Sequence, residues 1–318
     1  MRMTQLKTIA DIQTGPFGSQ LHKEDYVETG TPIVTVEHLG NRVFTEQNLP
    51  RVSDSDKARL IKYTLSTGDI VFSRVGSVDR CSYVDKSHDG WMFSGRCLRV
   101  RPTELVDSLY LYYYFCLEET KQFVRNIAVG ATMPSINTKL LGEVEIALPD
   151  LNNQKRIAAV LSSLDDKIEN NQKLNDNLAD LLQTIYQGRF GNDILAVNQG
   201  VLSDICSYST DKVAVSELNV RTYFSTENML SGKAGSTEAT SLPTTSQTTA
   251  CHKGDTLISN IRPYFKKIVY CEDKCGCSTD VLCFTPSQPC YSAYLFSTLY
   301  ADKFFAFMKC PVEISSRL

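Results

Sequence analysis

A duplicated local pattern constrains the fold of this chain more than any other feature of its sequence. Residues 65–78 read LSTGDIVFSRVGSV, and residues 251–264 read CHKGDTLISNIRPY. Each stretch has a Gly-Asp pair, a short apolar run and a serine before a polar segment. Because Gly-Asp marks a turn and the apolar runs are rich in β-branched residues, each stretch predicts a turn that leads into a strand.

The duplication extends well beyond these two stretches, and the matching blocks follow the same order in both halves. Glu37 and His38 fall opposite Glu227 and Asn228. A repeat of this length is too long for a solenoid unit, so it indicates two copies of one domain. The further matching blocks are 6–15 with 202–210, 32–40 with 222–232, 81–85 with 267–273, 90–102 with 276–286, and 109–124 with 293–308.

Each copy is predicted to combine a sheet with a helix. Segments such as 69–75 and 95–102 are short and bounded by Gly, Pro or Asp, which is typical of strands. Residues 108–128 place apolar side chains on a helical period without a breaker, so they predict one helix packed on the sheet. The sequence therefore favours a mixed α+β domain.

The segment between the copies, residues 152–190, has a different pattern. It contains no Pro, and no Gly before Gly188. Its heptad seam is apolar except at Lys167 and Asn171, which predicts a coiled-coil helix about 50 Å long in which Asn171 fixes the register. An amphipathic helix lying on a globular core is the alternative. The seam positions are Ile157, Val160, Leu164, Lys167, Asn171, Leu174, Leu178, Leu181 and Ile185.

These observations predict an α+β fold with two tandem domains separated by a long coiled-coil helix. The first domain is expected at 1–150, the helix and a linker at 151–198, and the second domain at 199–318. A rod between two copies of one domain would hold two recognition modules a fixed distance apart.

Composition narrows the class of protein. The chain has 318 residues, 42% hydrophobic and 22% charged, which is ordinary for a globular protein with two cores. It has no apolar run near the length of a membrane helix and no secretory signal, so we expect a cytoplasmic protein without a membrane partner. The net charge of −3 means that any DNA contact must come from local patches.

The sequence gives little support for catalysis or metal binding. The 11 cysteines are expected to be free and mostly buried, because Cys271, Cys275 and Cys277 lack the paired spacing and the histidines of a zinc site. The four histidines are scattered, and no nucleotide, cofactor or hydrolase motif is present. The carboxylates of Asp165 and Asp166 are expected to face solvent. We therefore predict a non-catalytic protein without a cofactor.

Polar side chains in Gly- and Pro-containing loops are the candidate DNA contacts of the first copy. Gln can read adenine through two hydrogen bonds, and Lys can contact guanine or phosphate. The alternative for each loop is an ordinary solvated turn. The candidates are Ser19, Gln20, His22 and Lys23 in 15–23, Ser73, Arg74, Ser77 and Arg80 in 73–80, and Thr132 and Asn137 in 129–139.

Two further groups of candidates come from the strand at 95–102 and from the second copy. Strand alternation places Arg99 and Arg101 on one face, as a stripe toward phosphate or simply on the solvated side. The copies agree in their apolar frame and differ in their turns, as expected for two readers with different targets. The second-copy candidates are Asn260, Arg262, Tyr264, Lys266 and Lys267.

With these segments in view, the chain resembles the specificity subunit of type I restriction-modification systems. The resemblance is carried by TGPFGSQL at 14–21, GDIVFSR at 68–74 and GDTLIS at 254–259. It is also carried by 130–169, which begins GATMPSINTKLLGEVEIALPD and runs into the long helix.

The resemblance implies a set of partners. Each recognition domain would read one half of a split site in double-stranded DNA, and long helices in an antiparallel coiled coil would set the spacing. Methyltransferase subunits would dock on the helices and domains, and a motor-nuclease subunit would join them. The specificity subunit itself would carry no catalytic residues.

The second copy departs from this pattern after residue 308. The sequence continues as KCPVEISSRL, where a Gly-rich loop, a return strand and a second long helix are expected, so the second domain is predicted to be incomplete. Two explanations stay open: a shortened gene, or a helix at 152–190 that pairs with the same helix of another chain. A non-catalytic interaction scaffold that has lost DNA reading is the alternative function.

Overall fold

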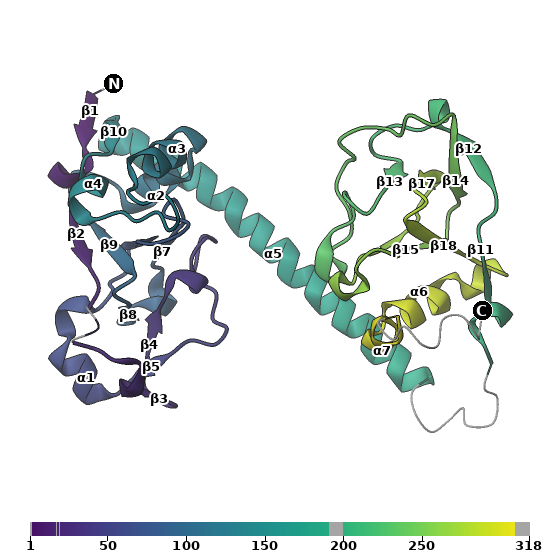
Figure 1. The fold of residues 1–318 in the computed structure, drawn as a ribbon, viewed down its shortest axis with the longest axis horizontal. Coiled ribbons are helices and arrows are strands. Elements are labelled where there is room, and N and C mark those ends of the chain that lie inside the picture. Colours follow the sequence, from purple (N-terminus) through teal and green to yellow (C-terminus); the bar gives the residue numbers. More distant parts are fainter. Residues whose placement is uncertain (1, 17, 19, 191–199, 309–318) are drawn as a thin grey trace. The chain divides into compact units, whose positions relative to one another are not determined.

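The structure, a computed structural model, describes residues 2–16, 18, 20–190 and 200–308. It forms two compact units, Met1–Asn170 (unit 1) and Asn171–Leu318 (unit 2). The mixed α+β class predicted from the sequence is confirmed, with sheets and helices in both units (Figure 1).

The long helix predicted between the copies is α5 (Leu151–Phe190). It is continuous, and its first part belongs to unit 1 while its last part belongs to unit 2 (Figure 1). The sequence set residues 151–198 apart as a spacer, whereas the structure divides this helix between the units. Residues 191–198 of the expected linker and the tail from 309 lie outside the described residues.

Unit 1 is built on a four-stranded antiparallel sheet in the order β2-β9-β6-β7. Its central strand β6 is buried along its whole length because both faces of the sheet are covered. Ile70 and Phe72 face a core shared with the helices, and Val71 faces a second core. The strands are β2 (Ala10–Thr14), β9 (Cys97–Pro102), β6 (Ile70–Ser73) and β7 (Cys81–Tyr83).

A second, smaller sheet of unit 1 has the order β3-β5-β4-β8, with β4 and β8 parallel. Buried side chains of this sheet, including Ile33, Met92 and Phe93, form the second core together with Val71. The short helix α1 (Asp54–Arg59) follows β5. The strands are β3 (Tyr26–Val27), β5 (Arg51–Val52), β4 (Thr31–Val34) and β8 (Met92–Phe93).

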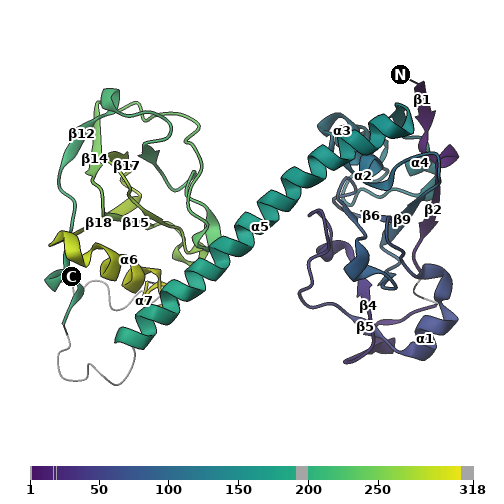
Figure 2. The same cartoon turned by 180° about the vertical axis from the view of Figure 1, so that it is seen from behind.

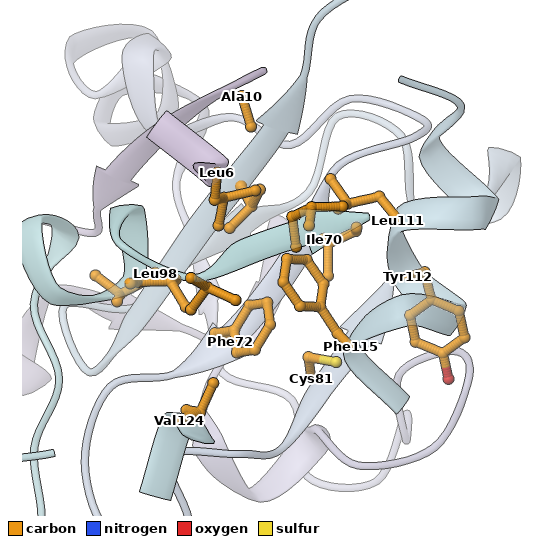
Figure 3. Packing of buried hydrophobic residues seen from close by; sticks show 14 of the residues in the cluster. Leu6, Ala10, Ile70, Phe72, Cys81, Leu98, Leu111, Tyr112, Phe115 and Val124 are labelled. Carbon is orange, nitrogen blue, oxygen red and sulfur yellow. The ribbon is translucent and has the colours of Figure 1, made fainter. Parts of the chain in front are cut away.

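The prediction of a single helix over 108–128 is wrong. The segment forms α2 (Ser108–Cys116) and α3 (Glu118–Ile127), separated by Leu117 in an extended conformation. A straight helix would carry Val124 about 13 Å beyond Phe115. The break instead lets both side chains enter the core around Phe72 (Figure 3), whose ring meets that of Phe115 edge to face at 4.7 Å.

The end of unit 1 closes over its beginning. Strand β10 (Glu145–Leu148) pairs antiparallel with β1 (Arg2–Gln5). The helix α4 (Thr138–Gly142) lies beside β2 and the 3-10 helix η1 (Leu6–Thr8), as Figures 1 and 2 show. The sequence-distant segments 2–14 and 138–148 therefore form one layer of this unit.

The first part of α5 is anchored to unit 1 by one of its faces. Gln154 and Ala158 are buried, and Gln154 Oε1 accepts a hydrogen bond from Asp107 N–H. The expectation that the paired carboxylates face solvent is wrong for Asp165, which accepts a hydrogen bond of 2.8 Å from the Tyr113 hydroxyl. Asp166 is half-exposed and pairs with Arg42 at 2.5 Å.

Unit 2 repeats the architecture of unit 1. Its main sheet has the order β11-β18-β15-β16, which matches β2-β9-β6-β7 strand for strand. The helices α6 (Ser292–Tyr300) and α7 (Asp302–Phe307) are separated by extended Ala301, as α2 and α3 are by Leu117. The strands are β11 (Cys206–Tyr208), β18 (Val281–Pro286), β15 (Thr256–Ser259) and β16 (Ile268–Tyr270).

The predicted register of the repeat is confirmed by equivalent hydrogen bonds. Thr35 N–H donates to His38 Nδ1 at 3.0 Å, and Ser225 N–H donates to Asn228 Oδ1 at 2.7 Å. The backbone carbonyls of His38 and Asn228 each accept a hydrogen bond from a residue nine or fewer positions later, which is Thr45 in unit 1 and Thr237 in unit 2. His38 and Asn228, which the sequence alignment matches, therefore hold equivalent positions in the two units.

The Gly-Asp pairs at 68–69 and 254–255 form the same kind of turn in both units. Gly68 and Gly254 have φ of 94° and 96°, a region that favours glycine. Asp69 and Asp255 are buried, and each accepts a backbone hydrogen bond of 2.8 Å from the residue three positions earlier. Each pair thus forms a side-chain-locked turn ahead of a buried strand.

The second sheets of the two units differ in connectivity. In unit 2 the order is β12-β14-β17-β13, and β14 pairs with β17. In unit 1 the Gly-Asp alignment places residues 61–65 opposite β14. These residues form a 3-10 helix (Ile61–Tyr63) and a single antiparallel bridge between Thr64 and Met92, while β5 pairs with β4. The strands are β12 (Lys212–Ala214), β14 (Gln247–Cys251), β17 (Cys275–Cys277) and β13 (Tyr223–Phe224).

The last part of α5 lies beside α6 in unit 2 (Figure 2). Gln183 Nε2 donates to Ser297 O at 3.2 Å, and the Tyr186 hydroxyl lies 3.0 Å from Thr298 Oγ1. The predicted seam points elsewhere, because its apolar side chains are exposed. These side chains are Ile157, Val160, Leu164, Leu174, Leu178, Leu181 and Ile185, and Asn171 between them is exposed as well.

The cysteines, the helices and the potential metal ligands of the described residues give three findings. The ten described cysteines are free, and only Cys290 is exposed. No described helix has the length and apolar character that a membrane crossing requires. Within the described ranges, no group of three or more Cys, His, Asp or Glu side chains is arranged to hold a metal ion.

Candidate nucleic-acid interface

In unit 1, the turn that follows β6 is fixed by the residues predicted to read DNA. Ser73 is buried, and its hydroxyl donates to Val75 O at 2.8 Å. Arg74 donates from its backbone to Arg96 O at 2.8 Å and from its guanidinium to Gly95 O at 3.1 Å. Arg74 therefore clamps the 94–96 turn in addition to any contact with a ligand.

Ser77 and Arg80, the two remaining candidates of this turn, differ in how far their side chains are already hydrogen-bonded. Ser77 is exposed at the tip. The Arg80 guanidinium donates a hydrogen bond to Leu39 O, so one of its nitrogens is already used within the unit. Ser77 is thus the more accessible of the two.

The 129–136 loop is held against the same turn. Gly76 N–H donates to Pro134 O at 2.8 Å, and Ile136 N–H donates to Arg74 O at 2.9 Å. Thr132 is exposed in this loop. Asn137 is also exposed, but its side chain accepts from Leu140 N–H at 2.9 Å and caps α4. The structure therefore brings together two loops that the sequence predicted separately.

The 15–23 loop contacts the 94–97 segment, which the Arg74 guanidinium also contacts. Gly15 N–H donates to Cys97 O, and a Cβ on Gly15 would lie 2.1 Å from Ser94 O, so the approach requires glycine. Gln20 Oε1 accepts from the Tyr63 hydroxyl at 2.7 Å, and His22 is exposed. Ser19 and the Lys23 side chain, both predicted contacts, lie outside the described residues.

The 15–23 loop, the 35–37 segment and the 94–96 turn border a groove of about 690 Å³ at one end of the main sheet. Its walls carry hydrogen-bonding groups of both kinds, including the exposed Arg96 guanidinium and the exposed Glu37 carboxylate. The sequence reasoning missed this groove, although the alignment of Glu37 with Glu227 offered a signal. The lining residues are Pro16, Gly18, Leu21, Tyr26, Thr35, Val36, Glu37, Ser94, Gly95 and Arg96.

Arg99 and Arg101 lie on one strand face, as predicted, but that face is not an open phosphate-facing stripe. Arg99 is only 5% exposed, and its guanidinium pairs with Asp11 at 2.6 Å. Arg101 is half-buried and binds the Asp69 carboxylate through two nitrogens, at 2.7 and 2.6 Å. These hydrogen bonds raise the pKa of the Arg101 guanidinium. Both arginines therefore stabilise the sheet, and their DNA contact stays a prediction.

In unit 2, the turn after β15 occupies the place of the 73–80 turn. Ser259 Oγ donates to Ile261 O, and Asn260 N–H donates to Asp280 O at 2.9 Å, as Ser73 and Arg74 do in unit 1. Asp280 therefore takes the position of Arg96. The same backbone frame thus presents a carboxylate in one unit and a guanidinium in the other.

The tip of this turn is an exposed aromatic and basic surface. Tyr264 is 53% exposed, and its ring contacts that of Phe265 with centroids 4.6 Å apart. Arg262 and Lys266 have φ of 52° and 51°, which fixes an unusual backbone course on either side of the rings. The Arg262 guanidinium has no partner among the described residues 200–308.

The two lysines of this turn are bonded within unit 2. Lys266 Nζ pairs with Asp302 at 2.9 Å, and Lys233 Nζ pairs with the same carboxylate at 2.7 Å. These two ammonium groups lower the pKa of Asp302 to about 2. Lys267 Nζ donates to Thr226 O at 2.6 Å. Of the predicted cations, Arg262 is therefore the most available.

The arrangement resembles a recognition surface. The loops present amide, hydroxyl, guanidinium and aromatic groups, which can bind base edges and phosphates. Within the groove of unit 1, the Thr35 hydroxyl donates to the Glu37 carboxylate at 3.0 Å and lies 3.0 Å from His38 Nδ1.

A family model described as "Type I restriction modification DNA specificity domain" matches residues 1–179. The match covers more than half of the 318 residues, and the chain belongs to this family. The resemblance inferred from the sequence motifs is thereby confirmed.

Individual proteins agree with this assignment. The type I restriction enzyme MjaIX specificity subunit of Methanocaldococcus jannaschii is 37% identical over 89 residues, 28% of this chain and 21% of that protein. The HindI specificity subunit of Haemophilus influenzae is 26% identical over 158 residues, 48% of this chain and 34% of that protein. The matches thus span between about a fifth and a third of these relatives' lengths.

A solved structure shares the fold. The S subunit of a type I restriction-modification system from M. genitalium aligns with a TM-score of 0.61 and 19% identity, over 97% of this chain and 79% of that one. The arrangement of two sheet-containing units and a long helix is therefore a fold found in S subunits.

Proposed function

We propose that this chain is a DNA-recognition subunit of a type I restriction-modification complex, and that each unit reads one part of a split site in double-stranded DNA. One observation carries the proposal beyond family membership. Both units use the same backbone anchors after the central strand, yet the groups held there differ. Arg74 and Arg96 in unit 1 correspond to Asn260 and Asp280 in unit 2.

The difference in side chains gives a physical basis for two specificities. A guanidinium such as that of Arg96 can donate two hydrogen bonds to guanine, whereas the carboxylate of Asp280 can accept from the cytosine amino group. Arg262 can contact guanine or phosphate, and the exposed rings of Tyr264 and Phe265 can contact thymine methyl groups.

The charge of the chain limits how much phosphate binding it can supply. With a net charge of −3 and most loop cations already paired, it would bind DNA through few phosphate contacts. We therefore propose that methyltransferase subunits, and with them a motor-nuclease subunit, provide most of the DNA grip and all of the catalysis. The chain itself would act without cofactor, in the cytoplasm.

We further propose that the exposed seam of α5 packs against another long helix. Seven apolar seam side chains are exposed along the helix, while a different face holds Gln154 and Ala158 in unit 1. An unpaired seam of this length is a hydrophobic surface that favours association. When no other long helix is available, the same helix of a second chain is the partner.

A scaffold that has lost DNA reading is the second candidate. The apolar groove of unit 2 described below, with Val201 and Tyr208 exposed, is a surface of the kind that binds other proteins and favours this candidate. It differs from the reader in one measurable respect, since a scaffold would assemble with the methyltransferase without selecting any sequence.

Selection of bound sequences from random DNA tests the proposal. The chain is co-purified with its methyltransferase subunit, and the bound pool is sequenced. An asymmetric two-part motif would support two readers in one chain, and a palindromic one would support pairing through α5. Absence of any enriched sequence would contradict DNA reading and favour the scaffold.

The seam makes a separate prediction. Because Leu174 and Leu178 are exposed on the seam, replacing both with Asp should abolish helix pairing without unfolding either unit. Light scattering should then give the mass of one chain where the unchanged protein gives two. The matched control is Gln172→Asp and Lys173→Asp, at exposed heptad positions b and c away from the seam, which should leave the mass unchanged. An unaltered mass in the seam variant would contradict the pairing.

A further inference from the structure

Unit 2 has an apolar groove beside its edge strand. The groove measures about 430 Å³ and lies over β11, the 3-10 helix η6 (Leu202–Asp204) and β18. Val201 is 64% exposed and Tyr208 is 43% exposed. The lining residues are Val201, Leu202, Ser203, Cys206, Ser207, Tyr208 and Phe284.

The same face of unit 1 is covered. By strand register, Leu6 and Ile12 in unit 1 correspond to Leu202 and Tyr208 in unit 2. In unit 1 the segment α4–β10 lies on this face, and Leu6 N–H donates to Val144 O at 2.9 Å. Leu6 is fully buried as a result.

The covering segment has a pattern that explains how it fits. Leu141 and Ile146 are fully buried and belong to the main core. Between them, a Cβ on Gly142 would lie 3.1 Å from Lys7 Cβ, so glycine allows α4 to approach η1 closely. The cover is therefore a short helix that ends in Leu-Leu-Gly, followed by a strand of alternating apolar residues.

Within residues 200–308, which the structure describes, no segment lies over this groove as α4–β10 lies over η1 and β2 in unit 1. The Leu-Leu-Gly sequence occurs once in the 318 residues, at 140–142, where it is buried in unit 1. A second copy of this chain would have to open its own unit 1 to donate that segment.

We propose that the groove of unit 2 is a docking site for a segment with the pattern of residues 138–148, and that a separate peptide of this pattern binds there. This inference does not depend on DNA reading. It follows from the duplication, because one copy of the domain shows which kind of segment the other copy binds. Docking would complete the apolar layer over Tyr208 and Phe284.

A synthetic peptide with the sequence of residues 134–150 is a direct probe. Labelled peptide is titrated with the full chain, and binding is followed by fluorescence anisotropy. Saturable binding is expected, at least tenfold weaker with Val201→Asp or Tyr208→Asp, both at exposed positions where the fold tolerates a charge. A peptide with Leu140→Asp and Leu141→Asp should fail to bind.

Leu230→Asp, at another exposed leucine of unit 2, is the matched control and should bind like the unchanged chain. Absence of saturable binding, or binding that Val201→Asp and Tyr208→Asp leave unchanged, would overturn the proposal. So would a dimer of the chain alone that Val201→Asp dissociates, because the groove would then be covered by a second copy.

Discussion

The main sheets of units 1 and 2 agree in strand order, in the Gly-Asp turn and in the broken helix pair, whereas their second sheets, turns and outer cover differ. The shared features are buried and hold the backbone. The differing turns and cover are at the surface or at the sheet edge, whereas the second sheets form buried cores of their own. The comparison teaches that this domain keeps a fixed frame and varies the groups that the frame presents.

The frame itself has one internal difference. In unit 1 the buried Asp69 pairs with Arg101, whereas in unit 2 the buried Asp255 accepts from Cys283 Sγ at 3.3 Å. The position of Arg101 is occupied by Thr285 in unit 2. One turn geometry is therefore compatible with a charged partner and with a neutral one, which makes the pair of units a natural experiment.

The largest expected effect is the loss of stability when a buried side chain of a central strand is removed, and it should be confined to one unit. Phe72 and Ile258 occupy equivalent positions of the central strands, and both are buried. Phe72→Ala should lower the free energy of unfolding of unit 1 by about 3–5 kcal/mol, and Ile258→Ala that of unit 2 by about 2–5 kcal/mol. Hydrogen exchange resolved by peptide should show each loss in one unit only. A loss spread equally over both units would break the comparison.

The next effect distinguishes the buried carboxylates. Asp69→Asn removes the charged partner of Arg101 and should cost about 1.5–3 kcal/mol in unit 1. Asp255→Asn removes no arginine pair, only a longer contact of 3.8 Å with His252 Nδ1, and should cost about 1 kcal/mol in unit 2. Urea unfolding followed by hydrogen exchange measures both. Equal costs would mean that the Arg101 pair adds nothing to the shared turn.

The glycines of the turns should respond more alike. Gly68→Ala and Gly254→Ala each place a side chain at positive φ, at a cost of about 1 kcal/mol. The cost should be greater at Gly254, because its Cβ would lie 3.0 Å from Ser292 Oγ, against 3.4 Å from Ser108 Oγ at Gly68. Thermal unfolding of the two variants orders them, and a stabilised variant would contradict the turn geometry.

The smallest expected effect depends on pH. Asp302 has a pKa of about 2, below the ordinary value, because Lys233 and Lys266 bind it. A depressed folded pKa stabilises unit 2 above the ordinary pKa of Asp near ~4, and that stabilisation is lost as pH falls toward ~2. Its size should stay below ~1 kcal/mol because Asp302 is exposed.

Asp302→Asn should remove this part of the pH dependence of unit 2. In unit 1 the corresponding Glu118 pairs within its own helix, with Arg125, so Glu118→Gln is the matched control. Denaturant unfolding of unit 2 between pH 5 and pH 2, at several values, would show the difference. A pH slope identical in Asp302→Asn and the unchanged chain would contradict the assignment.

Much of the fold could be predicted because it depends on local pattern. The strand order of unit 2 follows from unit 1 once the Gly-Asp turns are aligned, and the long helix follows from an uninterrupted heptad seam. The break at Leu117 could not be predicted, because no Pro or Gly marks it. It arises from packing, which brings Phe115 and Val124 to one core.

The candidate interface was less predictable for the same reason. The sequence indicated candidate loops but not the partners of their side chains. Arg99 looks like a surface cation until the strand pairing places Asp11 beside it. Arg74 and Asn137 likewise have roles in holding loops and caps that only the assembled unit defines.

The central claim is that the two units read different sequence elements. Replacing one candidate contact in each unit, one at a time, tests this claim. Arg96→Ala alters the exposed turn of unit 1, and Arg262→Ala alters that of unit 2. Random-sequence selection with each variant, assembled with the methyltransferase, should lose discrimination at a different part of the motif. Loss at the same positions in both variants, or in neither, would contradict the account.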